Sequence, residues 1–506
     1  MRLLKTVAAC ASILIAYTSA QSNLTTPQKT QQILKGDFEP PQVFKHINLV
    51  RNTNLEKGYV RETINVVVEN VDKQPQSEYY FPFEYAVMGR VGGFEVRDKK
   101  DSAKGKFQVT PAGLEAVLDE GVSSKPTQYY VVHFPQPLES KSQLTLTISY
   151  NVLGSLAPLP ASIKQDDKQY LTYDFSAYVP SVYPTLKQKT KVKFPTTDIP
   201  EYTKTSGLKS SSDPEQQGST FTYGEYDTSK LPLGTKYPVS VRYEFTKPIL
   251  ACTLLERDLE VSHWGGNLAT EERYWLRNDG ANLTNHFNRV SWASQSYFNA
   301  PTTALRELKY PLRPGSVDPY FTDDIGNVST SRYRPNRIRE ASLELKPRYP
   351  LFGGWKYSFR IGWNNALSGY LRKLKTGNTY VLSVPLLEGP KMPEGVQYER
   401  VEVRVILPEG ATNVKWEATG GSGLPDLEAS ETSQKTFMDT LGRPSLKLVA
   451  HNVGDDLRDS ALTITYDYTT VAALRKPFTI FAGVVSVFIV AWALGNVDTS
   501  IGKKAK

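Results

Sequence analysis

Short stretches in which apolar and polar residues alternate make up most of this chain. Typical examples are residues 143–150 (QLTLTISY) and 401–407 (VEVRVIL), which are rich in threonine, valine and leucine. Alternation with a period of two predicts half-buried β-strands. Prolines and glycines interrupt these stretches at short intervals, as at residues 134–137 and 311–315. This punctuation favours antiparallel β-sandwiches over βαβ units, so we expect a mainly β fold.

A continuous apolar run lies near the amino terminus, at residues 7–17 (VAACASILIAY). Arg2 and Lys5 precede the run, and three small residues, TSA, follow it. A positive start, a short apolar stretch and a small-residue cleavage site are the parts of a secretory signal peptide. We therefore expect residues 1–20 to be a signal peptide and residues 21–38 to be a lead-in to the mature chain.

A second apolar run, residues 478–494, contains 17 residues and no charge. As an α-helix it would span about 25 Å, slightly less than the roughly 27 Å of an endoplasmic reticulum bilayer. Trp492 near one end and the cationic flanks favour a transmembrane helix at residues 477–495 over a buried core helix. After a cleaved signal peptide the orientation is single-pass type I, which places residues 496–506 in the cytosol.

The cytosolic tail ends in the sequence KKAK. Lys503 and Lys504 stand at the fourth and third positions from the end, a spacing that resembles a di-lysine retrieval signal. A basic membrane flank is the alternative interpretation of the same residues.

A faint internal repeat divides the region between the two apolar runs. Three pairs of segments share an offset of 213 residues, and a fourth pair has an offset of 223: 54–55 with 267–268, 148–151 with 361–364, 192–195 with 405–408, and 241–246 with 464–469. We predict two tandem β-sandwich-like lumenal domains, at residues 39–250 and 251–472. Coincidence among strand-rich segments is the alternative.

The composition is that of an ordinary globular protein: 506 residues, 40% hydrophobic, 22% charged and a formal net charge of +8. Of the two cysteines, Cys10 lies in the expected signal peptide, so the mature chain keeps only Cys252. One thiol cannot form an internal disulfide in an oxidising lumen. The fold must depend on its core, and we expect Cys252 to be a small buried residue.

Motifs that would indicate catalysis by this chain are absent from the sequence. There is no zinc-ligand spacing, no glycine-rich phosphate loop and no Gly-x-Ser-x-Gly elbow. Acidic pairs occur at Asp166–Asp167, Asp323–Asp324 and Asp455–Asp456, and we expect each to lie in a solvated loop. We therefore assign no catalytic, cofactor-binding or metal-binding residue to this chain.

The densest positive cluster is residues 332–339 (RYRPNRIR). In a strand, Arg332 and Arg334 would share one face, and so would Arg337 and Arg339, which suits an anionic partner such as a lipid headgroup, a diphosphate or an acidic subunit. An exposed strand with intramolecular partners is the alternative. The expected lumenal compartment excludes nucleic acid as the partner.

Three Asn-x-Ser/Thr sequons mark acceptor sites for N-glycans in a lumenal chain. They begin at Asn23, Asn282 and Asn327. Asn23 stands beside the expected cleavage site, so we favour Asn282 and Asn327.

Three segments of the chain closely resemble the ribophorin I family, the first subunit of the oligosaccharyltransferase complex. They are residues 318–331 (DPYFTDDIGNVSTS), 346–356 (KPRYPLFGGWK) and 263–267 (HWGGN). The resemblance extends in order over nearly the whole ectodomain, and the short tail is similar to that of the fungal form.

This resemblance implies a non-catalytic subunit of an endoplasmic reticulum membrane enzyme. That enzyme transfers a preassembled oligosaccharide from dolichyl diphosphate to Asn-x-Ser/Thr sequons of nascent polypeptides. The resemblance places the metal and the dolichyl-linked donor at a polytopic catalytic partner, and gives this chain the roles of scaffolding and of presenting acceptor chains. The alternative is a stand-alone membrane-tethered lectin or chaperone; a glycosidase would need a converging carboxyl pair about 5–10 Å apart.

Overall fold

The computed structural model describes most of the chain between residues 33 and 496. The described residues are 33–34, 40–101, 105–112, 114–115, 127–205, 207–208, 213–232, 234–375, 377–420, 427–435, 439 and 441–496. The expected signal peptide, Asn23, Lys503 and Lys504 lie outside them. The chain divides into two compact units, residues 1–38 with 113–125, and residues 39–112 with 126–506. In the smaller unit, β1 (Ile33–Leu34) pairs antiparallel with β7 (Leu114–Glu115).

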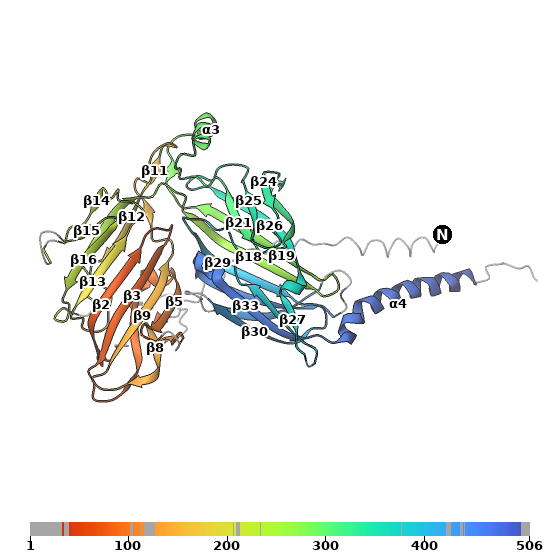
Figure 1. The fold of residues 1–506 in the computed structure, drawn as a ribbon, viewed down its shortest axis with the longest axis horizontal. Helices are drawn as coiled ribbons and strands as arrows, with labels where there is room; N and C mark the ends of the chain where they lie inside the picture. The colour runs from red at the N-terminus through yellow and green to blue at the C-terminus, as the bar shows by residue number, and fades with distance from the viewer. Residues whose placement is uncertain are drawn as a thin grey trace, which may run out of the picture. The chain divides into compact units, whose positions relative to one another are not determined.

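The larger unit consists mainly of β-strands, as predicted, followed by one long helix (Figure 1). We divide its strands into a first and a second strand set, each with a main sheet, a four-stranded sheet and a three-stranded sheet. The main sheet of the first set has the order β15-β16-β13-β2-β3-β9-β5. Its strands are β2 (Phe44–Asn54), β3 (Val60–Asn70), β5 (Val91–Asp98), β9 (Gln143–Val152), β13 (Gln188–Lys193), β15 (Glu215–Gln217) and β16 (Thr220–Tyr226).

Two smaller sheets complete the first strand set, in the orders β10-β12-β17-β14 and β4-β8-β6. Their strands are β10 (Ala157–Pro158), β12 (Tyr170–Ser176), β14 (Glu201–Tyr202), β17 (Pro238–Glu244), β4 (Gln76–Glu84), β6 (Gln108–Pro111) and β8 (Thr127–Leu138). The short helix α2 (Tyr85–Met88) follows β4.

The main sheet of the second strand set has the order β23-β22-β26-β19-β18-β29-β32-β31. Its strands are β18 (Leu250–Ser262), β19 (Asn267–Asn278), β22 (Val317–Asp323), β23 (Gly326–Asn327), β26 (Lys356–Ala366), β29 (Val396–Ile406), β31 (Glu428–Gln434) and β32 (Arg443–Val453). In these main sheets β13 pairs parallel with β2, and β29 pairs parallel with β18, whereas the other pairs are antiparallel.

The smaller sheets of the second set have the orders β27-β28-β33-β30 and β21-β25-β24. Their strands are β27 (Leu371–Lys373), β28 (Thr379–Pro385), β30 (Thr412–Gly420), β33 (Ser460–Asp467), β21 (Leu308–Leu312), β24 (Ser331–Arg334) and β25 (Ala341–Leu345). Helix α3 (Arg289–Tyr297) and the 3-10 turns η2 (Leu367–Gly369) and η3 (Asp455–Asp459) lie between strands. One pair joins the two sets: β11 (Ser162–Ile163) runs parallel to β20 (Asn282–Leu283).

The second strand set repeats the first in the same chain order. In the main sheets β2, β3, β9 and β13 correspond to β18, β19, β26 and β29, and the two smaller sheets match in the same way. Even the irregularities recur, because a β-bulge follows His46 in β2 and Cys252 in β18. Three of the four repeat pairs seen in the sequence fall on corresponding strands. The pair at residues 54–55 and 267–268 does not, because Asn54 ends β2 whereas Asn267 begins β19.

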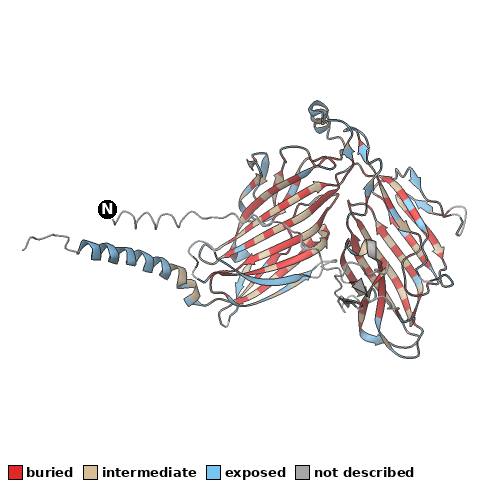
Figure 2. Ribbon diagram, turned by 180° about the vertical axis from the view of Figure 1, so that it is seen from behind, coloured by how far each residue is buried: buried red, intermediate tan, exposed pale blue. Residues whose placement is uncertain are grey.

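Alternating side chains build the core of each strand set. Along β3 and β19 every second residue is buried, which is the period-two pattern of a strand with one face on the core (Figure 2). The core includes large aromatic residues, among them Tyr243 in the first set and Trp363 in the second. Cys252 is fully buried in the core of the second set.

A buried arginine joins two sheets in each strand set. Arg51 on β2 donates to the carbonyl oxygen of Ser176, the last residue of β12. Arg257, at the corresponding position of β18, lies 3.4 Å from the carbonyl oxygen of Pro385, the last residue of β28. The two strand sets therefore use the same contact, from the main sheet to the end of a strand in the four-stranded sheet.

Two carboxylates balance the charge of Arg257. Its guanidinium donates to Glu272 and, at 2.6 Å, to Glu388, while the hydroxyl of Tyr274 donates to Glu272 at 2.5 Å. Burial alone would lower the pKa of Arg257, but the charges of Glu388 and Glu272 raise it. Burial raises the pKa of Glu272 despite the neighbouring arginine. Arg257 is therefore a fully buried cation held by acceptors from two strands and a loop.

Helix α4 (Thr470–Gly495) follows β33 and has 26 residues, none of them buried. It is long and apolar enough to cross a membrane. It begins seven residues before the predicted start of the span, because the side chain of Thr469 accepts a hydrogen bond from the backbone N–H of Ala472 and caps the helix there.

Arg257→Ala should destabilise the fold by about 3–5 kcal/mol, because it leaves the fully buried carboxylate of Glu272 without its counter-ion. The urea midpoint of the full chain in detergent, followed by circular dichroism, measures this loss. Arg404→Ala is the matched control: Arg404 pairs with Asp258 on neighbouring strands but is partly exposed, so we expect about 1 kcal/mol or less. Equal losses in the two variants would contradict the role given to Arg257.

Candidate functional site

A pocket of about 460 Å³ opens on the second strand set, beside the turn that joins β22 to β23. Its walls combine aromatic and charged side chains: Trp275, Tyr349, Tyr357, Asp323, Asp324 and Lys356. These residues come from β19, β22, β26 and the loop before β26, which are far apart in the sequence. The pocket is therefore a product of the sheet topology.

Asp323 holds the rim of the pocket in place. Its carboxylate accepts hydrogen bonds from the backbone N–H groups of Ile325 and Gly326, both at 3.0 Å, and from the hydroxyl of Tyr357 at 3.1 Å. Arg348 forms an ion pair with the same carboxylate. Burial alone would raise the pKa of Asp323, but these partners lower it. Asp323 is therefore a structural anion, not a proton donor.

The groups that remain available for a ligand lie beside this anchored turn. Asp324 is exposed and accepts one hydrogen bond, from the hydroxyl of Ser358. Lys356 is exposed and its ammonium has no ion pair among the described residues, while Ile325 is 79% exposed. Flat aromatic rings next to hydrogen-bonding charges suit an extended peptide or a sugar ring.

The arginine cluster forms an exposed basic surface on the same strand set. Arg332, Arg334, Arg337 and Arg339 are all exposed, and none has an ion pair in the part of the chain that the structure describes. The alternative interpretation, with intramolecular partners, is therefore not what the structure shows. We call these four residues the arginine surface.

Only half of the arginine cluster is a strand. Arg332 and Arg334 lie on β24, as predicted, but β24 ends at Arg334. Pro335 follows, and the side chain of Asn336 accepts hydrogen bonds from the backbone N–H groups of Ile338 and Arg339, both at 2.9 Å. The expectation that Arg337 and Arg339 share a strand face is wrong, because this Asx turn replaces the strand.

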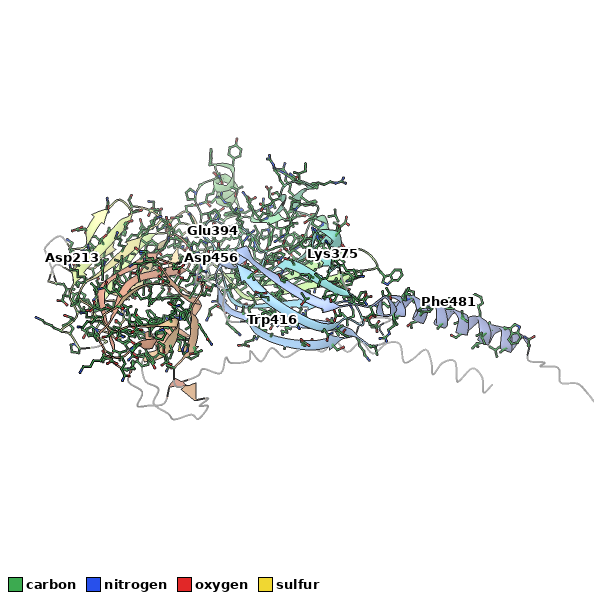
Figure 3. All side chains as sticks on the ribbon, turned by 60° about the horizontal axis from the view of Figure 1, so that its bottom comes forward. Asp213, Lys375, Glu394, Trp416, Asp456 and Phe481 are labelled. Carbon is green, nitrogen blue, oxygen red and sulfur yellow. The ribbon has the colours of Figure 1, made fainter. Side chains whose placement is uncertain are left out.

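The acidic pairs have different surroundings. Asp166 and Asp167 are exposed, as predicted. Asp455 and Asp456 are not in a free loop, because both contact the first strand set: Lys57 lies 2.6 Å from Asp455, and Arg61 pairs with Asp456. Figure 3 labels Asp456 and Glu394 where the two strand sets meet. Within the described residues, no group of three or more His, Cys, Asp or Glu side chains could hold a metal ion.

The buried titratable groups of the core serve the fold. His46 lies 3.1 Å from the hydroxyl oxygens of both Thr185 and Tyr79, and burial lowers its pKa to about 3. Burial raises the pKa of the Cys252 thiol, which makes it a poor nucleophile. These two residues occupy corresponding positions beside the bulges of β2 and β18.

Acidification should destabilise the chain through His46. In the unfolded chain a histidine titrates near pH 6.5. Between about pH 6.5 and 3 the unfolded state therefore binds a proton that buried His46 does not, so stability falls as pH falls across this window. His46→Gln should reduce the slope of the urea midpoint against pH. An unchanged slope in His46→Gln would contradict this prediction.

The two described sequons are accessible. Asn282 on β20 and Asn327 on β23 are both exposed. Asn327 follows the anchored turn of the pocket, and its carbonyl oxygen accepts a hydrogen bond from Arg348 at 2.9 Å. Both positions therefore have the surface location that a glycan acceptor needs; their occupancy stays a prediction.

Sequence reasoning did not find the pocket. Asp323 and Asp324 were recognised as an acidic pair, but their aromatic neighbours were not. The signal available was Trp275, a large aromatic residue at a position of β19 that alternation assigns to the outer, less buried face. An aromatic side chain on the polar face of an amphipathic strand could have marked it.

The chain matches the family model described as Ribophorin I over residues 44–495. The chain belongs to the ribophorin I family. The segments at residues 263–267, 318–331 and 346–356 that indicated this family form, respectively, the β18–β19 turn, the rim of the pocket and the loop that carries Arg348.

Several relatives carry the name dolichyl-diphosphooligosaccharide–protein glycosyltransferase subunit 1 or 1B. The Schizosaccharomyces pombe protein is 29% identical over 440 residues, which cover 87% of this chain and 92% of the relative. The Caenorhabditis elegans protein is 31% identical over 471 residues, covering 92% of this chain and 75% of the relative. The Arabidopsis thaliana subunit 1B is 28% identical over 477 residues, covering 92% and 96%.

Solved structures give a much weaker similarity. Native leukotriene A4 hydrolase from Saccharomyces cerevisiae matches 43% of this chain and 29% of its own, with 9% identity and a TM-score of 0.25. This value is too low to support any conclusion about function.

Proposed function

We propose that this protein is a non-catalytic subunit of the oligosaccharyltransferase complex, which transfers an oligosaccharide from dolichyl diphosphate to sequon asparagines of nascent proteins. The observation that carries the proposal is the family match over residues 44–495, with relatives named as subunit 1 of that transferase. The chemistry of transfer, with its metal and its dolichyl-linked donor, belongs to a polytopic partner subunit. This chain contributes position and stability.

The membrane placement follows from the two apolar segments. Residues 1–20 direct the chain into the endoplasmic reticulum, α4 crosses the membrane once, and the strand sets lie in the lumen as two domains, residues 39–250 and 251–472. Lys503 and Lys504 then serve as a retrieval signal on the cytosolic side. The repeated strand order supports the division into two domains.

Two surfaces of the second strand set serve the complex. The arginine surface is exposed and unpaired among the described residues, so it suits an acidic face of another subunit. The pocket around Trp275 and Asp324 suits a segment of the acceptor polypeptide, because it is lined by aromatic rings with free polar groups at the rim. The pocket is lined mainly by strands β19, β22 and β26, and the arginine surface begins on β24, so the sheets of the second strand set position both.

Affinity purification of the tagged full chain in mild detergent should recover a polytopic partner together with transfer of oligosaccharide to a sequon peptide. Arg332→Glu with Arg334→Glu should lower both recovery and transfer several-fold, because the surface then repels an acidic partner. Lys191→Glu with Lys230→Glu, an equal charge change on exposed lysines of the first strand set, is the control. A monomeric, inactive eluate from the unaltered chain would refute the subunit proposal.

Asn282→Gln and Asn327→Gln should each remove one glycan. The measurement is the mobility of the full chain on denaturing gels before and after digestion with an endoglycosidase. Each single variant should run lower by one glycan, and the double variant should lose a second step. Unchanged mobility in a single variant would show that its sequon is not used.

The same pocket favours one alternative, a membrane-tethered lectin or chaperone that acts without the transferase. Its aromatic lining would give saturable binding of a glycan or an unfolded peptide by the purified chain alone. Trp275→Ala would then abolish binding of the glycan or peptide. Under this alternative, affinity purification of the unaltered chain would recover no other subunits.

A further inference from the structure

Pro477 leaves one carbonyl group of α4 without its helical partner. In an α-helix the carbonyl oxygen of Ala473 would accept from the backbone N–H four residues later, but that residue is Pro477, which has none. The indole Nε1–H of Trp264 donates to this oxygen at 2.8 Å. A side chain from the β18–β19 turn, 209 residues earlier, thus supplies the missing hydrogen bond.

Other contacts hold the first turns of α4 against the second strand set. A Cβ atom at Gly410 would lie 2.9 Å from the Cβ of Ala472, so glycine permits this close approach. Lys476 forms an ion pair with Asp439 at 2.5 Å. Ala472 and Ala473 pack on the core of the set. The start of α4 is therefore fixed to the loops around it.

The position of Trp264 along α4 defines its depth. Its acceptor, Ala473, stands five residues before Phe478, where the apolar run begins. Five residues correspond to about 7.5 Å along a helix axis. The interfacial layer on each side of a bilayer is about 5–7 Å thick. When residues 478–494 fill the hydrocarbon core, the ring of Trp264 lies in or next to that layer, where tryptophan is enriched in membrane proteins.

Exposed apolar side chains accompany Trp264 at this end of the strand set. Trp264 is 64% exposed, Leu374 49% and Leu441 60%. The turn after Leu374 is tied to the start of α4, because the N–H of Tyr468 donates to the carbonyl oxygen of Asn378 at 2.9 Å. Figure 3 labels Lys375 in this turn and Phe481 on α4. Leu441 lies two residues from Asp439, the partner of Lys476.

We propose that Trp264, Leu374 and Leu441 form a lipid-contacting surface in the interfacial layer of the lumenal leaflet. The partner is the headgroup and glycerol region of a phospholipid bilayer. Trp264 has two roles in this surface: its ring inserts among the lipids, and its N–H fastens α4. The inference rests on the proposed crossing of the membrane by α4, and goes beyond it by fixing the lumenal domain against the bilayer.

Fluorescence quenching by brominated lipids tests this surface. The full chain is reconstituted in phosphatidylcholine vesicles with bromine near the carbonyl end or near the methyl end of the acyl chains. The fluorescence of the unaltered chain minus that of the Trp264→Phe variant gives the fluorescence of Trp264. The fluorescence of Trp492 is obtained in the same way from the Trp492→Phe variant. We expect shallow bromine to quench the Trp264 signal at least two-fold, and deep bromine to quench it less.

Comparing the quenching of Trp492 with that of Trp264 distinguishes failure of the lipid-contacting surface from failure of the membrane crossing. If Trp492 is quenched but Trp264 is not quenched by either lipid, α4 crosses the membrane and the lipid-contacting surface is refuted. If Trp492 is not quenched by either lipid, the membrane crossing itself fails, and the surface fails with it.

The hydrogen bond is tested by a double-variant cycle. Trp264→Phe should speed proteolysis between β33 and α4 about two- to ten-fold, the factor expected for one lost hydrogen bond. Pro477→Ala restores a backbone donor for Ala473, so Trp264→Phe should have a smaller effect in that background. Equal effects of Trp264→Phe in both backgrounds would refute the fastening role.

Discussion

In each strand set a buried arginine links the main sheet to the four-stranded sheet: Arg51 in the first set and Arg257 in the second. A guanidinium removed from water is costly unless acceptors surround it. The acceptors are the carbonyl at the end of β12 for Arg51, and Glu272, Glu388 and the carbonyl of Pro385 for Arg257. Because Ser176 and Pro385 end strands of the four-stranded sheets while Arg51 and Arg257 lie on the main sheets, a slip in strand register would separate each guanidinium from its carbonyl, so the contact favours one arrangement of the sheets.

The arrangement of the sheets determines which surfaces the second strand set presents to other molecules. The pocket is formed by β19, β22, β26 and the loop before β26, and its rim is fixed by Asp323 and Arg348. The arginine surface begins on β24, and the first turns of α4 are held by Trp264 and the N-cap of Thr469. The second strand set thus connects the arginine surface, the pocket and the apolar helix α4. Such an arrangement suits a subunit that positions other molecules.

Local patterns in the sequence predicted the strands, the apolar helix and three of four repeat pairs, because alternation and run length are local properties. The fourth pair failed because corresponding residues of β2 and β18, such as Arg51 and Arg257, stand 206 and not 213 residues apart, so one offset cannot hold along the whole chain. The prediction of a shared strand face for Arg337 and Arg339 failed because Asn336 forms a turn. The pocket and the partners of Asp455 required knowledge of which distant strands become neighbours, which the sequence pattern does not contain.

Controlled depletion of this chain from cells tests the central claim most directly, with two readouts on the same sample: the assembly of the transferase complex and the occupancy of sequons in other secreted glycoproteins. The account predicts that both fall together and recover when the full chain is restored. If the complex stays assembled and sequon occupancy is unchanged after depletion, the protein is not a positioning subunit of this enzyme.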